Sequence, residues 1–291
     1  VAIIGSGPSA FYAAQALFKS DLDINVDMFE KLPTPFGLLR GGVAPDHQRM
    51  KTVSKSYEKI ATNENYRFFG NVEIGKDIDF PTLKNHYHSV IMAIGTETDR
   101  KMNINGEDSD GSHTATEFVA WYNGQPNYQT KKFNLSGANA IIIGQGNVAV
   151  DVTRILSKPI GELEKTDITQ QALTLLENSQ LENLYMVGRR GPAQAAFTEL
   201  ELKELGHIEG VNLIIHDNLK KKIFYIINVF HDEKIKNYPN KYLCIKAEIS
   251  NLLIQSSLKN SVNLKPINSK IKVKSNTTKN KFLNMVNKAK R

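Results

Sequence analysis

The sequence of 291 residues has too few thiols for most thiol-based structures, because it contains a single cysteine, Cys244. This excludes a disulfide framework, a Cys-x-x-Cys redox pair and a four-thiolate iron–sulfur site within one chain. Any redox chemistry would therefore depend on a bound cofactor. No apolar run approaches the ~18 residues that span a bilayer, and the first residues show no signal-peptide pattern. We therefore expect a soluble protein without a transmembrane segment.

Glycine is missing from the last part of the chain. All 19 glycines lie at or before Gly210, although average usage would place about six of them in the remainder. Positive charge is concentrated in that remainder: residues 211–291 carry 17 Lys and Arg against 4 Asp and Glu, a net +13, while residues 1–210 are net −6. We predict a boundary near residue 212, followed by a basic Lys-, Asn- and Ile-rich tail of doubtful fold. Three explanations of this tail stay open: a sequence read through an intron or a frameshift, a divergent tail, or a divergent continuation of the fold. The tail has no nucleic-acid recognition motif, so we expect no specific nucleic acid partner.

One motif occurs twice, 139 residues apart. Residues 1–10 and 140–149 each read as an apolar strand, a Gly-x-Gly-x-x-Ala turn and the start of a helical pattern. The first glycine of such a motif permits a tight turn, and the second lets the backbone approach a pyrophosphate at the helix N-terminus. The repeat predicts two dinucleotide-binding units that use Gly5 and Gly7 in the first and Gly144 and Gly146 in the second.

The residue that ends the next strand distinguishes the two ligands. The strand expected at residues 24–30 ends in Glu30, whose carboxylate can accept ribose hydroxyls and repels a 2′-phosphate. The strand expected at residues 184–188 is followed by Arg189 and Arg190, which suit a 2′-phosphate. We therefore expect FAD or NAD in the first unit and NADP in the second, the alternative being that both arginines are solvated loop charges.

The connections between these strands complete the predicted fold. Residues 89–96 read as a buried strand that ends at a glycine turn and closes the first unit. Residues 157–179 read as an insertion in the second, with a helix start signal at residues 166–170. The predicted class is α/β, with two Rossmann-like domains, of which residues 1–98 bind FAD and residues 99–211 form a partial NADP domain.

Longer motifs add a family resemblance. Residues 35–47 read PFGLLRGGVAPDH, with glycines that let main chain lie against a flat ring. This segment resembles the flavin-covering loop of adrenodoxin reductase and the related adrenodoxin-type ferredoxin–NADP reductases. The resemblance extends from Val1 to about Glu204 and includes four further segments, namely residues 69–75, 121–124, 144–151 and 187–192.

The resemblance implies an FAD-dependent oxidoreductase that passes electrons from NADPH to a ferredoxin- or adrenodoxin-type iron–sulfur protein. It implies a mitochondrial location and leaves peripheral membrane association open. The implied FAD contacts are Ser9, Glu30, Leu38 and Ile74. The implied NADP contacts are Gln145, Gly146, Asn147, Val148, Arg189, Arg190 and Glu201. We expect His47 and Asp151 to be the polar residues nearest the contact between flavin and nicotinamide, and no metal site.

One segment of the resembled family is absent. Members return to the FAD domain with a Gly-Trp-x-Arg-Gly-Pro segment and a Gly-Val-Ile turn, and neither occurs in this sequence. The predicted FAD domain therefore lacks its C-terminal return segment. Two alternatives follow: a non-catalytic, incomplete form of such a flavoprotein, or another pyridine nucleotide–flavin oxidoreductase of the glutamate-synthase small-subunit type.

Overall fold

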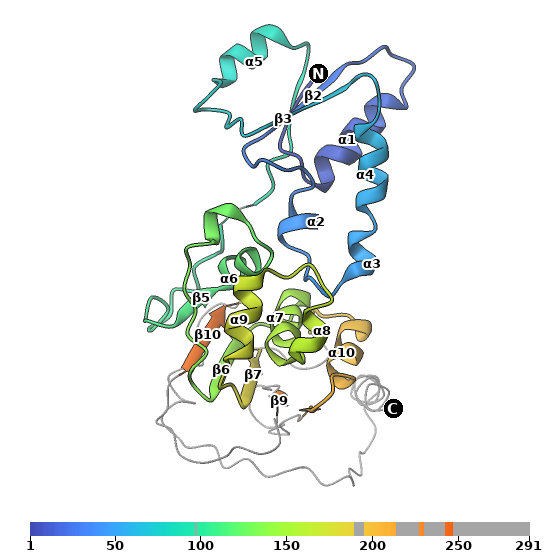
Figure 1. The fold of residues 1–291 in the computed structure, drawn as a ribbon. Helices are drawn as coiled ribbons and strands as arrows, with labels where there is room; N and C mark the ends of the chain where they lie inside the picture. Colours follow the sequence, from blue (N-terminus) through green and yellow to red (C-terminus); the bar gives the residue numbers. More distant parts are fainter. Residues whose placement is uncertain (97, 189–194, 214–226, 230–241, 247–291) are drawn as a thin grey trace, which may run out of the picture. The chain divides into compact units, whose positions relative to one another are not determined.

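The computed structural model describes residues 1–291 except residues 97, 189–194, 214–226, 230–241 and 247–291. Two compact units share the chain: Val1–Thr98 with Val119–Gln129, and Asp99–Phe118 with Thr130–Arg291. Helix α6 (Ala115–Tyr122) contains residues of both units. Each unit has a sheet with parallel strands and helices (Figure 1), so the predicted α/β class is confirmed.

The first unit has a four-stranded sheet in the order β3-β2-β1-β4. All of its pairs are parallel, with Ile3 opposite Met28 and Ile91 in register. Its elements are β1 (Ala2–Ile4), α1 (Pro8–Phe18), β2 (Val26–Glu30), α2 (Leu38–Gly41), α3 (Gln48–Lys51), α4 (Ser54–Ala61), β3 (Tyr66–Gly70), α5 (Phe80–His86), β4 (Val90–Met92) and the 3₁₀ turn η1 (Pro126–Tyr128). The strand and helix expected around the first glycine motif are therefore present.

Alternation along the strands gives this sheet two buried faces. Ile3 and Met28 point to one face, where they pack with Phe11 of α1 and Tyr57 of α4. The rings of Phe11 and Tyr57 stack with centroids 4.8 Å apart. Ile4 and its neighbours on the opposite face pack against α5. Because successive side chains of a strand alternate between faces, a sheet of short apolar strands is covered on both sides.

The prediction that residues 89–96 form a buried strand is wrong in one respect. Strand β4 forms in this segment, but Val90 and Ile91 are half-buried and the Met92 side chain is 59% exposed. The reason is position: β4 lies at one end of the sheet order and pairs with β1 on one side. A continuous apolar run cannot distinguish an edge strand from a central one.

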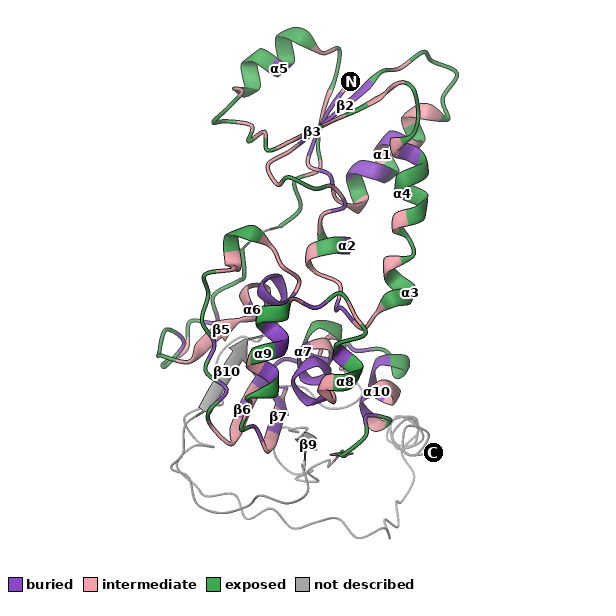
Figure 2. Ribbon diagram, in the orientation of Figure 1, coloured by how far each residue is buried: buried purple, intermediate pink, exposed green. Residues whose placement is uncertain are grey.

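The second unit contains the repeat of the strand-turn-helix arrangement. Its elements are β5 (Ser112–Thr114), β6 (Asn139–Ile143), α7 (Asn147–Ser157), α8 (Ile160–Leu163), α9 (Gln170–Glu177), β7 (Asn183–Val187), α10 (Glu199–Gly206), β8 (Val211–Asn212), β9 (Ile227–Val229) and β10 (Tyr242–Lys246). Helix α7 is buried along most of its length (Figure 2). Helix α9 lies in the expected insertion. Its N-cap is Thr169, which accepts a hydrogen bond from the Ala172 N–H and belongs to the predicted helix start signal at residues 166–170.

The second sheet includes strands from beyond residue 212. Its order is β5-β10-β6-β7-β9-β8, with β10 parallel to both β5 and β6, and β9 antiparallel to β7 and β8. Strands β9 and β10 lie beyond the predicted boundary near residue 212 and pair with strands of the second sheet. Strand formation depends on extended, β-prone segments and needs no glycine. Most of the remaining tail lies outside the described residues.

Candidate functional site

The first glycine loop joins three strands at the carboxyl edge of their sheet. The Gly5 N–H donates a 2.7 Å hydrogen bond to the carbonyl of Phe29, the last residue but one of β2. A Cβ on Gly5 would lie 2.3 Å from the Ala93 carbonyl oxygen, and the φ of Gly5 is +98°. Backbone crowding and a left-handed conformation both require glycine at this position.

Gly7 requires a different explanation, because its surroundings are open. Among the described atoms none lies within 4 Å of a Cβ added to Gly7. Gly7 is the N-cap of α1, and none of the described side chains caps this helix end. Free N–H groups at the start of a helix can bind an anion. In α1 the first residue, Pro8, has no N–H, and the Ala10 N–H donates to the Gly7 carbonyl at 3.0 Å. The side of Gly7 on which a Cβ would lie is therefore open at the N-terminus of α1.

Glu30 is held beside this loop by three hydrogen bonds. One of its carboxylate oxygens accepts the Ser6 N–H at 3.0 Å and the Ser6 hydroxyl at 2.6 Å, and the other accepts the Leu32 N–H at 3.0 Å. Ser6 is fully buried. A carboxylate can accept about four hydrogen bonds, so fixed orientation is compatible with further donors such as ribose hydroxyls.

The segment that resembles a flavin-covering loop lies on the first glycine loop. The Phe36 N–H donates a 2.9 Å hydrogen bond to the Ser6 carbonyl. A Cβ on Gly37 would lie 2.7 Å from the Gly7 Cα, so the two backbones touch. Phe36 has a φ of +89°, which is strained for a bulky residue, and its ring is buried against Phe11 at 5.2 Å. Packing of that ring holds the strained turn in place.

The other predicted residues of the first unit differ in exposure and in their contacts. Ser9 is exposed in the first turn of α1, and Leu38, which follows Gly37, is 66% exposed at the start of α2. Ile74 packs against the cluster that contains Ile4. His47 is the half-buried N-cap of α3, and its N–H donates to the Ala44 carbonyl at 3.0 Å.

The second glycine loop repeats the arrangement of the first. The Gly144 N–H donates a 2.9 Å hydrogen bond to the carbonyl of Val187, the last residue of β7. Gly146 is the N-cap of α7, again with no side-chain cap among the described residues and no described atom within 4 Å of an added Cβ. Val148 is 48% exposed in the first turn. Arg189 and Arg190, which follow β7, lie outside the described residues.

Residues 196–198 are attached to this loop by backbone donors. The Gln145 carbonyl accepts the N–H groups of Ala196 at 2.8 Å and Phe197 at 3.1 Å. The Asn147 side chain accepts the Thr198 N–H at 3.1 Å. The Gln145 amide nitrogen is buried, with no hydrogen-bond partner among the described residues. The glycine loop therefore has a buried donor available next to the helix N-terminus.

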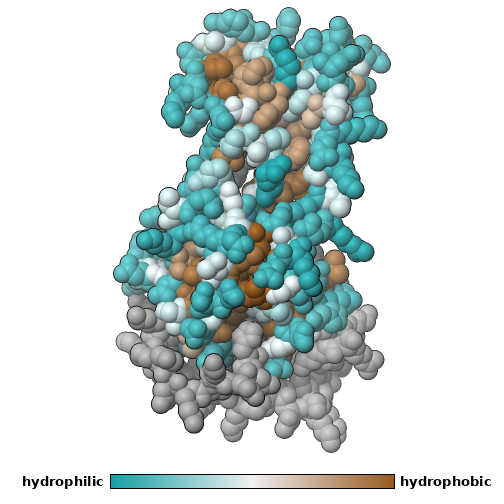
Figure 3. Space-filling view, in the orientation of Figure 1, coloured by the Kyte–Doolittle hydropathy of each residue, from teal (hydrophilic) through white to brown (hydrophobic). Residues whose placement is uncertain are grey.

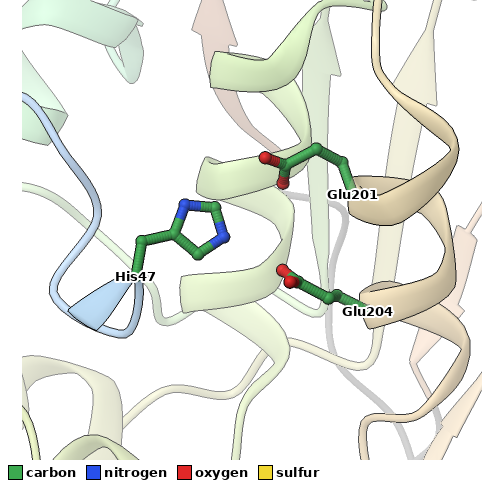
Figure 4. Close-up of side chains that lie close together, drawn as sticks. All are labelled: His47, Glu201 and Glu204. Atoms are coloured by element: carbon green, nitrogen blue, oxygen red, sulfur yellow. The ribbon is translucent and has the colours of Figure 1, made fainter. Parts of the chain in front are cut away.

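Asp151 and Glu201 meet at a buried arginine that the sequence interpretation missed. Arg154 of α7 is 1% exposed, and its guanidinium donates to Asp151 at 2.8 Å and to Glu201 at 3.1 Å. Glu204 lies 3.5 Å from the same guanidinium. Glu201 and Glu204 project from one side of α10 (Figure 4). The spacing of Asp151 and Arg154 is a recognisable helical pair, whereas no local signal connects Arg154 with α10.

The fold and the two loops define a class of protein before any comparison is made. Neighbouring parallel strands followed by helices that begin at open glycine turns are typical of proteins that bind dinucleotides. No family model matches the chain. Individual relatives do match, and they identify the class more closely.

Most of the chain is homologous to NADPH–ferredoxin and NADPH:adrenodoxin oxidoreductases, which confirms the resemblance noted above. The NADPH-ferredoxin reductase FprA of Mycobacterium tuberculosis is 50% identical over 220 residues, which are 74% of this chain and 48% of that protein. The mitochondrial NADPH:adrenodoxin oxidoreductase of Homo sapiens is 46% identical over 215 residues, 74% of this chain and 44% of that protein. This chain thus spans about half the length of the curated relatives it matches.

A solved structure agrees with these relatives. The structure of Mycobacterium tuberculosis FprA in complex with NADPH matches with a TM-score of 0.73 and 50% identity, over 74% of this chain and 49% of that one. Among the helices that the structure describes, none has the length and apolar character needed to cross a membrane. In the view of Figure 3 the described surface is mostly hydrophilic, with hydrophobic side chains in smaller areas.

Proposed function

We propose that the protein is an FAD-dependent oxidoreductase that passes electrons from NADPH to a ferredoxin- or adrenodoxin-type iron–sulfur protein. In this proposal residues 1–98 form an FAD-binding domain, and residues 99–211 form a partial NADP-binding domain, both Rossmann-like. One observation carries this proposal: Gly7 and Gly146 occupy the same position in the two glycine loops. Each is the N-cap of a helix that no described side chain caps, and no described atom lies within 4 Å of a Cβ added to either. Homology to proteins named for NADPH and ferredoxin supports the choice of ligands and partner.

The residues of the first unit would hold FAD at the carboxyl edge of their sheet. The uncapped start of α1 would bind the pyrophosphate, and Glu30, fixed by Ser6, would accept hydrogen bonds from the ribose. Leu38 and Ile94, which are 66% and 56% exposed, would offer apolar contacts to a flat ring. Ser9 and Ile74 are proposed as further contacts.

The residues of the second unit would hold NADPH. The start of α7 with residues 145–148 would bind the pyrophosphate, and the guanidiniums of Arg189 and Arg190 would pair with the 2′-phosphate. Asp151 and His47 are proposed to lie nearest the contact between flavin and nicotinamide. The two bound cofactors would supply hydride transfer and single-electron release, while the protein binds and orients them.

Two substitutions test the second site directly. Replacing Arg189 and Arg190 by alanine should weaken NADPH binding much more than NADH binding, because only NADPH has the 2′-phosphate.

Gly146→Ala should abolish NADPH binding while the protein stays folded, since its added Cβ would enter the space proposed for the pyrophosphate. Gly161→Ala is the matched control, because it also has open surroundings among the described atoms but lies in α8. For the variant that lacks both arginines, equal losses of NADPH and NADH would contradict the assignment.

An electron-acceptor screen tests the reaction and the partner. Reduction of cytochrome c that requires added ferredoxin would support the proposed function. Indifference to ferredoxin would favour the glutamate-synthase small-subunit type of oxidoreductase instead.

A second candidate is a non-catalytic, incomplete form of such a flavoprotein. It is favoured by one observation, that the chain spans 48% of the length of FprA. The two candidates differ in flavin content. This second candidate predicts weak or absent flavin in the purified 291-residue chain, whereas a full complement of tightly held yellow cofactor would exclude it.

The proposal includes a mitochondrial location, which rests on the resemblance alone. Relatives named as mitochondrial, from Arabidopsis thaliana and Homo sapiens, match at 45% and 46% identity, and bacterial FprA matches at 50%. Cell fractionation with an antibody against this chain tests the location.

A further inference from the structure

Arg154 is the most deeply buried charge that the described part of the chain places beside a candidate cofactor site. It lies on α7, eight residues after Gly146, with 1% of its surface exposed. Its guanidinium lies 2.8 Å from Asp151, 3.1 Å from Glu201 and 3.5 Å from Glu204. One cation therefore faces three carboxyl groups from two helices.

Stability alone does not account for this arrangement. Burying a charge is costly, and a buried ion pair often contributes no more than well-packed apolar residues of the same volume. Removing one partner of a buried ion pair is costly, however. Such a network instead fixes the relative positions of its members, since a planar guanidinium donates its hydrogen bonds only in fixed directions.

The geometry that Arg154 fixes is the position of α10 against α7. Helix α10 begins after Thr198, and the residues just before it are held by Gln145 and Asn147 in the glycine loop. Those hydrogen bonds attach one end of the segment. The Arg154 ion pairs attach the helix itself, one to two turns further on, at Glu201 and Glu204.

We propose that Arg154 is a positioning residue of the second dinucleotide site, which sets Glu201 and Asp151 relative to the glycine loop. Its relation to NADPH rests on the proposed function. The placement of α10 does not, and it can be tested without any nucleotide.

Hydrogen–deuterium exchange of the full chain tests the placement. Arg154→Met should accelerate amide exchange in residues 196–206 by about tenfold or more while residues 1–18 stay unchanged. Arg154→Lys keeps the positive charge but loses the planar guanidinium, so it should accelerate exchange less than Arg154→Met does. The control is Lys203→Met, which removes a cation from the surface of α10 where it lies 3.3 Å from Glu199. Unchanged exchange in residues 196–206, or equal acceleration throughout the chain, would overturn the proposal.

A double-mutant cycle on NADPH affinity tests the path through Glu201. Arg154→Met should weaken NADPH binding about fivefold or more in the otherwise unchanged chain, and less than about twofold when Glu201→Gln is already present. The same factor in both backgrounds would show that Arg154 does not act through Glu201, and would overturn the proposal. If the unchanged chain binds no NADPH, the proposed function fails, while the exchange measurement still decides the role of Arg154.

Discussion

The Ser6 hydroxyl and the Ser6 N–H both donate to the same carboxylate oxygen of Glu30, at 2.6 Å and 3.0 Å. Ser6 thus connects the glycine loop after β1 with the acid at the end of β2, 24 residues away. Ser6, which lies between Gly5 and Gly7, therefore has a structural role of its own. It orients the carboxylate that is proposed to bind the ribose.

The first prediction concerns this contact. Ser6→Ala should lower the free energy of unfolding by about 1.5–3 kcal/mol, because it removes a part-buried hydrogen bond from Ser6 to a charged group. Ser9→Ala is the matched control at an exposed position three residues later, where a change within about 0.5 kcal/mol is expected. Urea denaturation of both variants measures the difference, and equal stabilities would refute the importance of the Ser6–Glu30 contact.

The second prediction separates the two glycines of the first loop. Gly5→Ala should cost at least about 3 kcal/mol of folding free energy, because its Cβ would meet the backbone oxygen of Ala93 at 2.3 Å and its φ is +98°. Gly7→Ala should change stability by less than about 1 kcal/mol but weaken FAD binding. Thermal unfolding and flavin titration provide the two measurements. A Gly7→Ala variant that keeps full flavin affinity would contradict the proposed pyrophosphate position.

The third prediction concerns Gly188 at the end of β7. A Cβ on Gly188 would lie 1.9 Å from Cδ of Gln145, so Gly188→Ala must displace the end of that flexible side chain. We expect a loss of about 1 kcal/mol in the free energy of unfolding. The double variant with Gln145→Ala should recover it, because the displaced atoms are then absent. Urea denaturation of the single and double variants gives the coupling, and additive losses would refute the contact.

The fourth prediction is a pH dependence that comes from Asp27. Burial acts to raise the pKa of Asp27, but hydrogen bonds from Arg67 at 2.6 and 2.7 Å and from Tyr87 at 2.6 Å outweigh it and hold the pKa below its ordinary value of 3.8. Because the pKa is lower in the folded state, this carboxylate stabilises the fold above its unfolded pKa. That stability is lost as pH falls through the folded value.

Asp27→Asn should therefore be less stable than the unchanged chain near neutral pH, and the difference should shrink between about pH 5 and about pH 2. Unfolding free energies over that range provide the measurement. The control is Asp23→Asn, at an exposed position before β2. A stability difference for Asp27→Asn that does not change with pH would contradict the assigned role.

Local patterns in the sequence were sufficient for the elements around the two glycine loops. Apolar strands, glycine turns and helical spacing depend on neighbouring residues, so β1, α1, β6 and α7 could be predicted with their glycines. The positions of Glu30 at the end of one strand and of Arg189 and Arg190 after another could also be predicted from neighbouring residues. The edge position of β4 could not be predicted, because exposure depends on which strand lies beside it.

By itself, therefore, the sequence determined the α/β class, the two glycine loops and the resemblance to ferredoxin-type reductases. Only the tertiary structure decided that Ser6 holds Glu30, that Arg154 joins α7 to α10, and that β10 inserts between β5 and β6. The physical reason is separation along the chain: Arg154 and Glu201 are 47 residues apart. Such contacts form only when folding brings distant elements together, and no periodicity in the sequence records them.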